Sequence, residues 1–397
     1  MVSRFSHFKP RLRPPTPART PATQATDFLR KYAKDGEAAV AEPFKGITTD
    51  GTVLPGLFRI EKTGVSTGPI KDAADAFLAS LTSAQRASAL FAVESDAWRR
   101  WSNIHPWIMR HGVCLDELAP AQRERALALV RESLSPRGFE TARDVMWLNE
   151  TIREITGKDE EYGEWLYWLS FFGTPSVDGP WGWQIDGHHL IVNCFVLRDQ
   201  VVMTPMFMGS EPVEAETGKY AGTRVFEAEE RDGLVLVRSL SDAQRDTTIL
   251  AKDVPGELFT AAFRDNFEMR YEGIRYGELG GAQQRLLLDL MEIYVGRIRP
   301  GHARIRTEDV KRHLADTHFA WMGGIDEESV FYYRVHSPVI LIEFDHQRGI
   351  AMDNDEPSRN HIHTVVRTLN GNDYGRDLLR QHHAEFDHAR PGHRHAP

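Results

Sequence analysis

Cysteine is scarce in this chain, which has two cysteines, Cys114 and Cys194, among 397 residues. Two cysteines cannot form the disulfide framework of a small secreted domain, and neither belongs to a closely spaced pair of the kind that binds metals. Cys194 lies in an apolar run, where a free thiol behaves as a small hydrophobic side chain. Any metal site must therefore use nitrogen and oxygen ligands.

Long apolar runs are also absent. No segment approaches the roughly 18 uninterrupted apolar residues needed to span a bilayer, and residues 1–8 lack the apolar stretch of a signal peptide. With 41% hydrophobic residues the chain can nevertheless bury one large core or two moderate ones. We therefore expect a globular, cytoplasmic protein that has no membrane partner.

Positive charge is deficient, with 48 Lys and Arg residues against 57 Asp and Glu residues and a formal net charge of -9. Because affinity for nucleic acid comes mainly from clustered basic side chains, this balance argues against a nucleic-acid partner. The standard sequence motifs of serine hydrolases, dinucleotide-binding folds and P-loop nucleotide-binding proteins are missing too. These absences leave a small-molecule protein as the main expectation.

Two apolar stretches dominate the sequence, at residues 181–196 and 330–345. The first carries His188 and His189 at its start, and the second ends in acidic residues. Each stretch is typical of a buried strand. The predicted strand pairs are residues 167–172 with 183–196, and residues 319–323 with 331–344.

The two halves of the chain resemble each other. Four segments recur in the same order: residues 80–86 as 239–245, 112–122 as 273–283, 171–173 as 321–323, and 183–185 as 333–335. Ordered recurrence of this kind predicts an internal duplication. The expected fold is α+β, with two tandem α-helical/β-hairpin repeats packed with pseudo-twofold symmetry around antiparallel strands.

The rest of the chain is divided around these repeats. Residues 1–39 are predicted to be a disordered or extended arm because they are rich in Pro and Arg, and residues 40–70 are predicted to be a small β-hairpin region. The repeat units are residues 71–234 and 235–380. Residues 381–397 are expected to form a disordered, His-rich tail.

Several motifs are similar to an uncharacterised bacterial family, the domain of unknown function numbered 3500. The motifs are residues 181–190 (WGWQIDGHHL), 204–209 (TPMFMG), 332–335 (YYRV), 360–363 (NHIH) and 373–375 (DYG). The resemblance extends from about residue 40 to about residue 385. It implies no activity, and the family pattern implies an acid at position 368, where this chain has Thr368.

Histidines and acids at same-face spacing form the candidate site. His361 and His363 are two residues apart in an alternating segment, so a strand directs both imidazoles to one side. When the two repeats are aligned, His189 and Glu343 fall an even number of strand positions apart, so their side chains share a face. Glu343 directly follows the apolar run Val-Ile-Leu-Ile. We therefore predict that His189, His361, His363 and Glu343 are ligands of zinc, iron or manganese.

The candidate catalytic residues are Glu343, His188 and Arg334. Glu343 is costly to bury without a cation or a hydrogen-bond donor, and it is predicted to be a base or a metal ligand. Arg334 is its predicted partner in an ion pair. His188 is expected to support its neighbour His189.

Three functions fit these residues. The leading hypothesis is a metal-dependent enzyme that hydrolyses a small molecule with metal-activated water. The second is a non-haem iron oxygenase with two histidines and one carboxylate. The third is a non-enzymatic binding protein in which the histidines form a hydrogen-bonded structural network. A homodimer is possible on this sequence.

Overall fold

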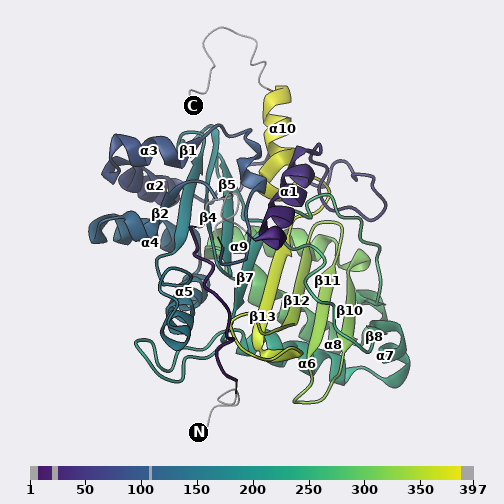
Figure 1. Ribbon diagram of the computed structural model, residues 1–397. Helices are drawn as coiled ribbons and strands as arrows, with labels where there is room; N and C mark the ends of the chain where they lie inside the picture. The colour runs from purple at the N-terminus through teal and green to yellow at the C-terminus, as the bar shows by residue number, and fades with distance from the viewer. Residues whose placement is uncertain (1–7, 20–25, 107–109, 386–397) are drawn as a thin grey trace.

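The computed structural model of the chain describes residues 8–19, 26–106 and 110–385. Within these residues the fold is α+β, with ten α-helices and a mixed sheet of 13 strands (Figure 1). None of the helices in these ranges combines the length and the apolar character that a membrane crossing requires. The core is organised on the two faces of the sheet.

The sheet follows the order β1-β3-β4-β5-β7-β13-β12-β11-β10-β8, with β2 beside β3, β6 beside β5, and β9 beside β10. The pairs β1·β3 and β8·β10 are parallel, and the other pairs are antiparallel. The strands are β1 (Leu90–Phe91), β2 (Val113–Cys114), β3 (Tyr167–Phe172), β4 (Pro180–Gly187), β5 (Leu190–Leu197), β6 (Gln200–Val202), β7 (Met206–Ser210), β8 (Ile249–Ala251), β9 (Ile274–Arg275), β10 (His318–Gly323), β11 (Phe331–His336), β12 (Leu341–Arg348) and β13 (Pro357–Arg367).

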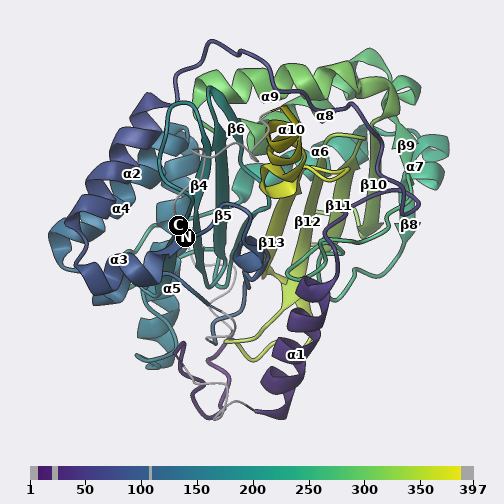
Figure 2. The same cartoon turned by 90° about the horizontal axis from the view of Figure 1, so that it is seen from above.

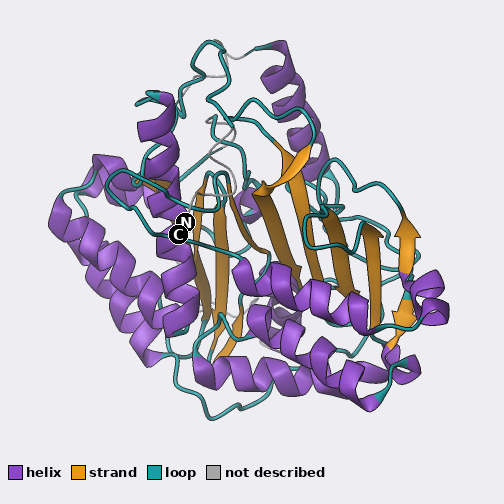
Figure 3. Cartoon of the chain, turned by 90° about the horizontal axis from the view of Figure 1, so that it is seen from below, coloured by secondary structure: helices purple, strands orange, loops and turns teal. Residues whose placement is uncertain are grey.

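Helices cover one face of the sheet (Figure 3). The α-helices of the chain are α1 (Asp27–Ala41), α2 (Gly68–Ser80), α3 (Ser83–Ala89), α4 (Pro120–Ser133), α5 (Pro136–Thr156), α6 (Glu227–Ser239), α7 (Asp242–Thr248), α8 (Gly281–Val295), α9 (Pro300–Arg312) and α10 (Arg376–Glu385). Apolar residues of α2, α4, α5, α6 and α8 pack against strand residues such as Leu169, Trp183 and Tyr333. Short 3-10 helices lie at Asp96–Arg99, Leu115–Glu117, Tyr276–Glu278, Leu314–Asp316 and Asp373–Gly375.

The other face is covered by two long connections, of which residues 92–106 with 110–112 and residues 252–273 are described, together with α10. Trp98, Leu258 and Leu378 from these segments pack against alternate residues of the central strands. Helix α1 lies on this side as well, across the sheet from α8 (Figure 2). Because strand residues alternate between faces, the polar residues of β12 and β13 that do not face the helices point toward these connections.

The predicted strand pairs are each split further by the structure. Residues 183–196 fall in two strands, β4 and β5, which are joined by a turn at His188 and His189. Residues 331–344 fall in β11 and β12. The expectation of one continuous strand is therefore wrong in both cases. In the first, His189 takes a positive φ of 62° where the chain reverses. In the second, residues 337–340 separate β11 from β12.

The N-terminal predictions also need correction. Residues 27–39 of the expected disordered or extended arm belong to helix α1, which continues to Ala41 and whose first turn is capped by Thr26. The predicted β-hairpin at residues 40–70 has no strand; its one bridge joins Thr48 to Glu268. Its apolar residues pack singly against the domain, as Ile47 does, and do not pair with each other. Of the predicted tail, residues 381–385 belong to α10, and the remainder lies outside the described residues.

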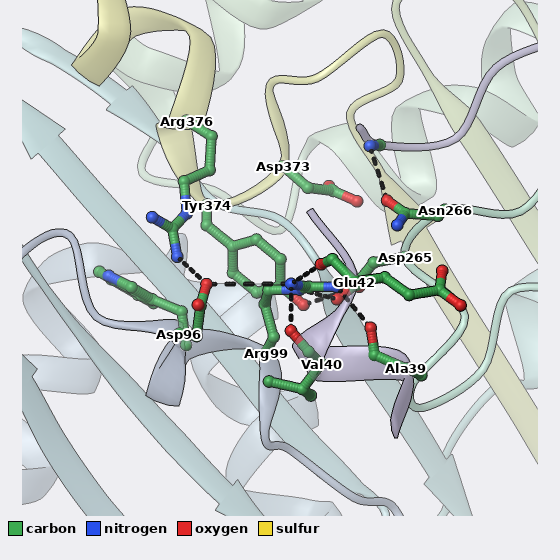
Figure 4. Close-up of polar contacts among 12 residues, drawn as sticks. Ala39, Val40, Glu42, Asp96, Arg99, Asp265, Asn266, Asp373, Tyr374 and Arg376 are labelled. Atoms are coloured by element: carbon green, nitrogen blue, oxygen red, sulfur yellow. Dashed lines mark hydrogen bonds and ion pairs between the residues drawn. The ribbon is translucent and has the colours of Figure 1, made fainter. Parts of the chain in front are cut away.

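A buried arginine joins α1 to the domain (Figure 4). Arg99 donates hydrogen bonds to the carbonyl oxygens of Ala39, Val40 and Glu42, at 2.9, 2.7 and 2.9 Å, where the helix ends. Its Nε lies 2.9 Å from Asp265 Oδ2, in the second long connection. A cation at a helix C-terminus satisfies carbonyl groups that have no partner within the helix.

The elements occur in two similar series along the chain. The series α2-α3-β1-β2-α4-α5-β3-β4-β5 is followed by α6-α7-β8-β9-α8-α9-β10-β11-β12. The strands β7 and β13 pair with each other at the middle of the sheet. Each series therefore supplies one flank of the sheet.

Candidate metal centre

Three buried histidines meet at the middle of the sheet. The Nε2 atoms of His189, His361 and His363 form a triangle with sides of 3.2, 3.0 and 3.1 Å. The three side chains come from residues that are 5%, 3% and 4% exposed. Three imidazole nitrogens at this separation form a potential binding site for one metal ion.

Hydrogen bonds at Nδ1 fix the ring orientations of His361 and His363. His361 Nδ1 lies 2.7 Å from the carbonyl oxygen of Arg348, and His363 Nδ1 lies 2.9 Å from Glu257 Oε1. Carbonyl and carboxylate oxygens accept hydrogen bonds, so both Nδ1 atoms carry the proton. In the neutral imidazoles the Nε2 lone pairs therefore point toward the centre of the triangle, which is the arrangement of metal-ligating histidines.

His189 reaches the same point from the β4–β5 turn. Its amide donates to the carbonyl of Asn103 at 3.2 Å, and its carbonyl accepts from the amide of Gly209 at 2.8 Å. His188 does not reach the centre: its ring stacks on His189 with centroids 3.8 Å apart, and its Nδ1 lies 2.8 Å from Asn149 Oδ1. His188 thus supports the position of His189.

Gly209 of β7 leaves the room that these rings occupy. A Cβ at this position would lie 2.6 Å from the Ile362 carbonyl oxygen, 2.9 Å from His363 Cδ2 and 3.4 Å from His189 Cδ2. The first two distances are shorter than real contacts of a Cβ atom. Close packing against glycine therefore holds two of the three rings in place.

If zinc occupies the triangle, Gly209→Ala should weaken its binding by about tenfold or more, because ligands must be held within about 0.5 Å of the productive geometry. Zinc affinity measured by competition with a chromophoric chelator tests this expectation. Gly277→Ala is the matched control, since a Cβ at Gly277 meets no atom within 4 Å. Equal affinity of the two variants would contradict the account of Gly209.

Two acids lie beside His363. Oxygen atoms of Glu257 and Asp345 and a ring nitrogen of His363 all lie within 4.8 Å of one another. Burial, with the nearby Glu257 and Glu343 carboxylates, raises the pKa of Asp345 well above its ordinary value. Burial also acts to raise the pKa of Glu257, but His363 holds it below its usual value. The Glu257 side chain is 34% exposed, so this side of the centre is open to solvent.

Glu343 is not brought to the triangle. Its carboxylate accepts hydrogen bonds from the amides of Phe259 and Thr260, at 2.8 and 3.0 Å, and from the Tyr332 hydroxyl at 3.0 Å. Burial raises the pKa of this carboxyl group. The structure thus gives Glu343 the role of fixing the connection at residues 252–273, in place of the predicted ligand or base.

Arg334 is also separate from the histidines. Its guanidinium group pairs with Glu272 and lies over the Phe259 ring, 5.8 Å from the centroid. The predicted ion pair with Glu343 is replaced by this contact. Arg334 therefore acts with Glu343 in holding the same connection.

A model of one protein family, described as a protein of unknown function (DUF3500), matches residues 63–376. The chain belongs to this family. The match includes the three histidines, Glu257 and Asp345, and it excludes helix α1. Neither the curated proteins nor the solved structures contain a significant match.

Within this DUF3500 chain two of the three histidines, His361 and His189, are held in their neutral form. Burial lowers the pKa of His361 well below its ordinary value, and the neighbouring His363 lowers it further. Burial and the neighbouring imidazoles do the same for His189. A neutral imidazole has the free lone pair that a metal ion requires.

Two acids of this DUF3500 site were missed or misjudged from the sequence. Glu257 follows Pro255 and Gly256 in a long connection, where no periodic pattern marks it. Asp345 shares the face of Glu343 on β12 and pairs with His363 across the ladder. The sequence signal for Asp345 is its position two residues after Glu343, which places both side chains on one face of the strand.

Proposed function

We propose that this protein is a metal-dependent enzyme that hydrolyses a small molecule at a three-histidine centre. The observation that carries the proposal is the triangle of Nε2 atoms of His189, His361 and His363, with sides of 3.0–3.2 Å. Zinc lies about 2.0–2.1 Å from each histidine nitrogen, so a tetrahedral site requires nitrogens about 3.3 Å apart. The triangle is close to that size.

A hydrogen-bonded histidine network fits the same triangle less well. The Nδ1 partners of His361 and His363 leave both Nε2 atoms as acceptors. A neutral His189 can supply at most one proton to the triangle, and the 3.0 Å contact between His361 and His363 still has no proton. Burial makes protonation of the His189 and His361 rings unfavourable, since it lowers the pKa of both. A cation removes the repulsion among all three nitrogens.

The ligand set favours hydrolysis over oxygenation. Three histidines with an open fourth position are typical of catalytic zinc, which lowers the pKa of bound water to about 7. The iron oxygenase hypothesis requires two histidines and one carboxylate, and the carboxylate predicted for it, Glu343, is held by Phe259 and Thr260. Zinc is therefore the metal we propose.

The acids beside His363 have distinct proposed roles. Glu257 accepts from His363 Nδ1, as the carboxylate of a carboxylate–histidine–zinc triad does. Asp345 is fully buried, and among the described residues its Oδ1 has no hydrogen-bond partner. We assign Asp345 to proton transfer with the substrate, because its raised pKa keeps a proton available.

Zinc-dependent hydrolysis tests the function. Chelator-treated protein is expected to lose turnover of 4-nitrophenyl acetate or bis(4-nitrophenyl) phosphate, and zinc is expected to restore it. Glu257→Gln should raise the zinc concentration that restores half of the turnover by about 10–100-fold. The control is Glu216→Gln, at an exposed position. Turnover that survives chelation, or that returns only with iron and oxygen, would contradict hydrolysis by zinc.

We also propose that the fold arose by duplication of one unit, with the two copies related by a pseudo-twofold axis between β7 and β13. The two series of elements support this proposal, and so do matching side-chain contacts. Thr82 and Gln85 form a capping box at α3, as Ser241 and Gln244 do at α7. Equivalent glutamines on α4 and α8 contact these boxes in each half.

A further inference from the structure

A cavity of about 440 Å³ lies at the other end of the central strands. Met206 of β7 and Val366 of β13, which pair with each other, line it, whereas His363 pairs with Gly209. Three residues of strand separate His363 from Val366, a distance of about 10 Å. Side chains at 363 and 366 also point to opposite faces. The cavity is therefore distinct from the metal centre.

The cavity wall combines apolar and polar residues. Its lining includes six buried or half-buried residues with apolar side chains or rings: Met206, Tyr294, Val295, Ile298, Ile340 and Val366. The ionisable residues on the wall include three arginines, Arg59, Arg306 and Arg312, and two acids, Glu61 and Asp309. A cavity of this size is large enough to hold a small molecule.

One buried polar group on the wall, a ring nitrogen of His302, has no hydrogen-bond partner among the described residues. His302, at the start of α9, is 5% exposed, and its Nε2 makes no hydrogen bond to any described residue. Buried polar atoms are nearly always hydrogen-bonded, so this nitrogen calls for a ligand atom. Burial lowers the pKa of His302 to about 4, so the ring is neutral at pH 7 and can donate from Nε2.

Arg306 supplies a fixed positive charge one helical turn further along α9. Its guanidinium group donates to the Val339 carbonyl at 2.7 Å and to the Thr368 hydroxyl at 3.1 Å, and it pairs with Asp309 at 2.8 Å. Residues at i and i+4 lie on the same side of a helix. His302 and Arg306 therefore face the cavity together.

We propose that this cavity binds an amphipathic monocarboxylate. The apolar body of the ligand packs against Met206, Ile340 and Val366, and its carboxylate accepts a hydrogen bond from His302 near the guanidinium group of Arg306. A carboxylate also suits the excess of arginines over acids on the wall. The proposal does not depend on the metal centre.

Calorimetric titration with octanoate and with octanol tests this proposal on the full chain. Octanoate is expected to bind with a stoichiometry of about one, and octanol at least about tenfold more weakly, because a hydrogen bond to a charged group is lost. His302→Leu should weaken octanoate binding by about tenfold and leave octanol binding within about twofold. Ile305→Trp, which fills the cavity, should abolish binding of both.

The control is Ile155→Trp, at an isoleucine that is 40% exposed on α5 and does not line the cavity. It should bind octanoate as the unmodified chain does. The proposal is overturned if neither probe binds, if both bind with equal affinity, or if Ile305→Trp retains binding. His302→Leu remains informative if the tryptophan variant fails to fold, because equal weakening of both probes would exclude recognition of the carboxylate.

Discussion

His361→Ala is expected to weaken zinc binding by more than about 100-fold, exceeding the roughly 10–100-fold effect of losing a residue that only supports a ligand. The loss removes one of three nitrogens that lie 3.0–3.2 Å apart. Zinc bound per chain after gel filtration should fall from about one to less than about a tenth. Elemental analysis measures this value directly.

Thermal unfolding of the same variant separates a metal ligand from a structural histidine. Zinc at 1,000 times its dissociation constant stabilises a protein by about 4 kcal/mol. The unmodified chain should therefore unfold at a higher temperature with zinc, and His361→Ala should show no such rise. The unfolding temperatures with and without zinc are compared within each protein, so the loss of stability caused by the cavity that alanine leaves cancels.

A matched control is His318→Ala, at a half-buried position of β10, where the ring contacts Tyr271 and the Asp316 carbonyl. Its response to zinc should equal that of the unmodified chain. An equal response in His361→Ala would contradict the three-histidine centre. A loss of stability without a change in zinc content would favour the structural network.

Asp265→Asn is expected to lower the free energy of unfolding by about 3–5 kcal/mol, because it removes the carboxylate that two buried arginines share and leaves Arg367 with Asp373 as its remaining buried counter-charge. Asp265 accepts from Arg99 Nε and from an Arg367 terminal nitrogen, both at 2.9 Å, and from the Tyr374 hydroxyl at 3.0 Å. Arg99 and Arg367 are 2% and 0% exposed. Asn keeps the shape of the side chain and removes its charge.

Urea unfolding measures this effect. Asp35→Asn, at a carboxylate that is 62% exposed and pairs with Lys31, should change the free energy of unfolding by less than about 0.5 kcal/mol. Helix α1 should also detach more readily in Asp265→Asn, since Asp265 holds the arginine that caps it (Figure 4). Similar effects of the two substitutions would show that the buried network adds little to stability.

The spacing of His361 and His363 carried most of what the sequence revealed about the centre. Alternation along one strand fixes which residues share a face, whatever the tertiary structure. The register of β13 between β7 and β12 then decided which neighbours they met. That register depends on contacts between distant segments, so Asp345 and Glu343 could not be distinguished in advance.

His189 was selected from the sequence for a reason that the fold does not support. The prediction assumed a continuous strand, on which His189 would share the parity of Glu343. The structure places His189 in a turn with φ of 62°, and its ring reaches the histidines because Asn103 and Gly209 bind its backbone. No local pattern in the sequence shows these two contacts.

Glu257 shows the limit of local patterns most clearly. It lies in the connection at residues 252–273, whose path is fixed by Glu343 binding the amides of Phe259 and Thr260. The sequence analysis correctly predicted that Glu343, as a buried acid, requires a partner. That partner is a loop of the same chain, and the loop delivers a different acid, Glu257, to His363.

Anomalous X-ray diffraction from crystals of the zinc-loaded protein, recorded on both sides of the zinc absorption edge, tests the three-histidine centre most directly. We predict one strong peak about 2.0–2.1 Å from the Nε2 atoms of His189, His361 and His363. No peak at the triangle, or a peak held instead by Glu257, Asp345 and His363 Nδ1, would contradict the account.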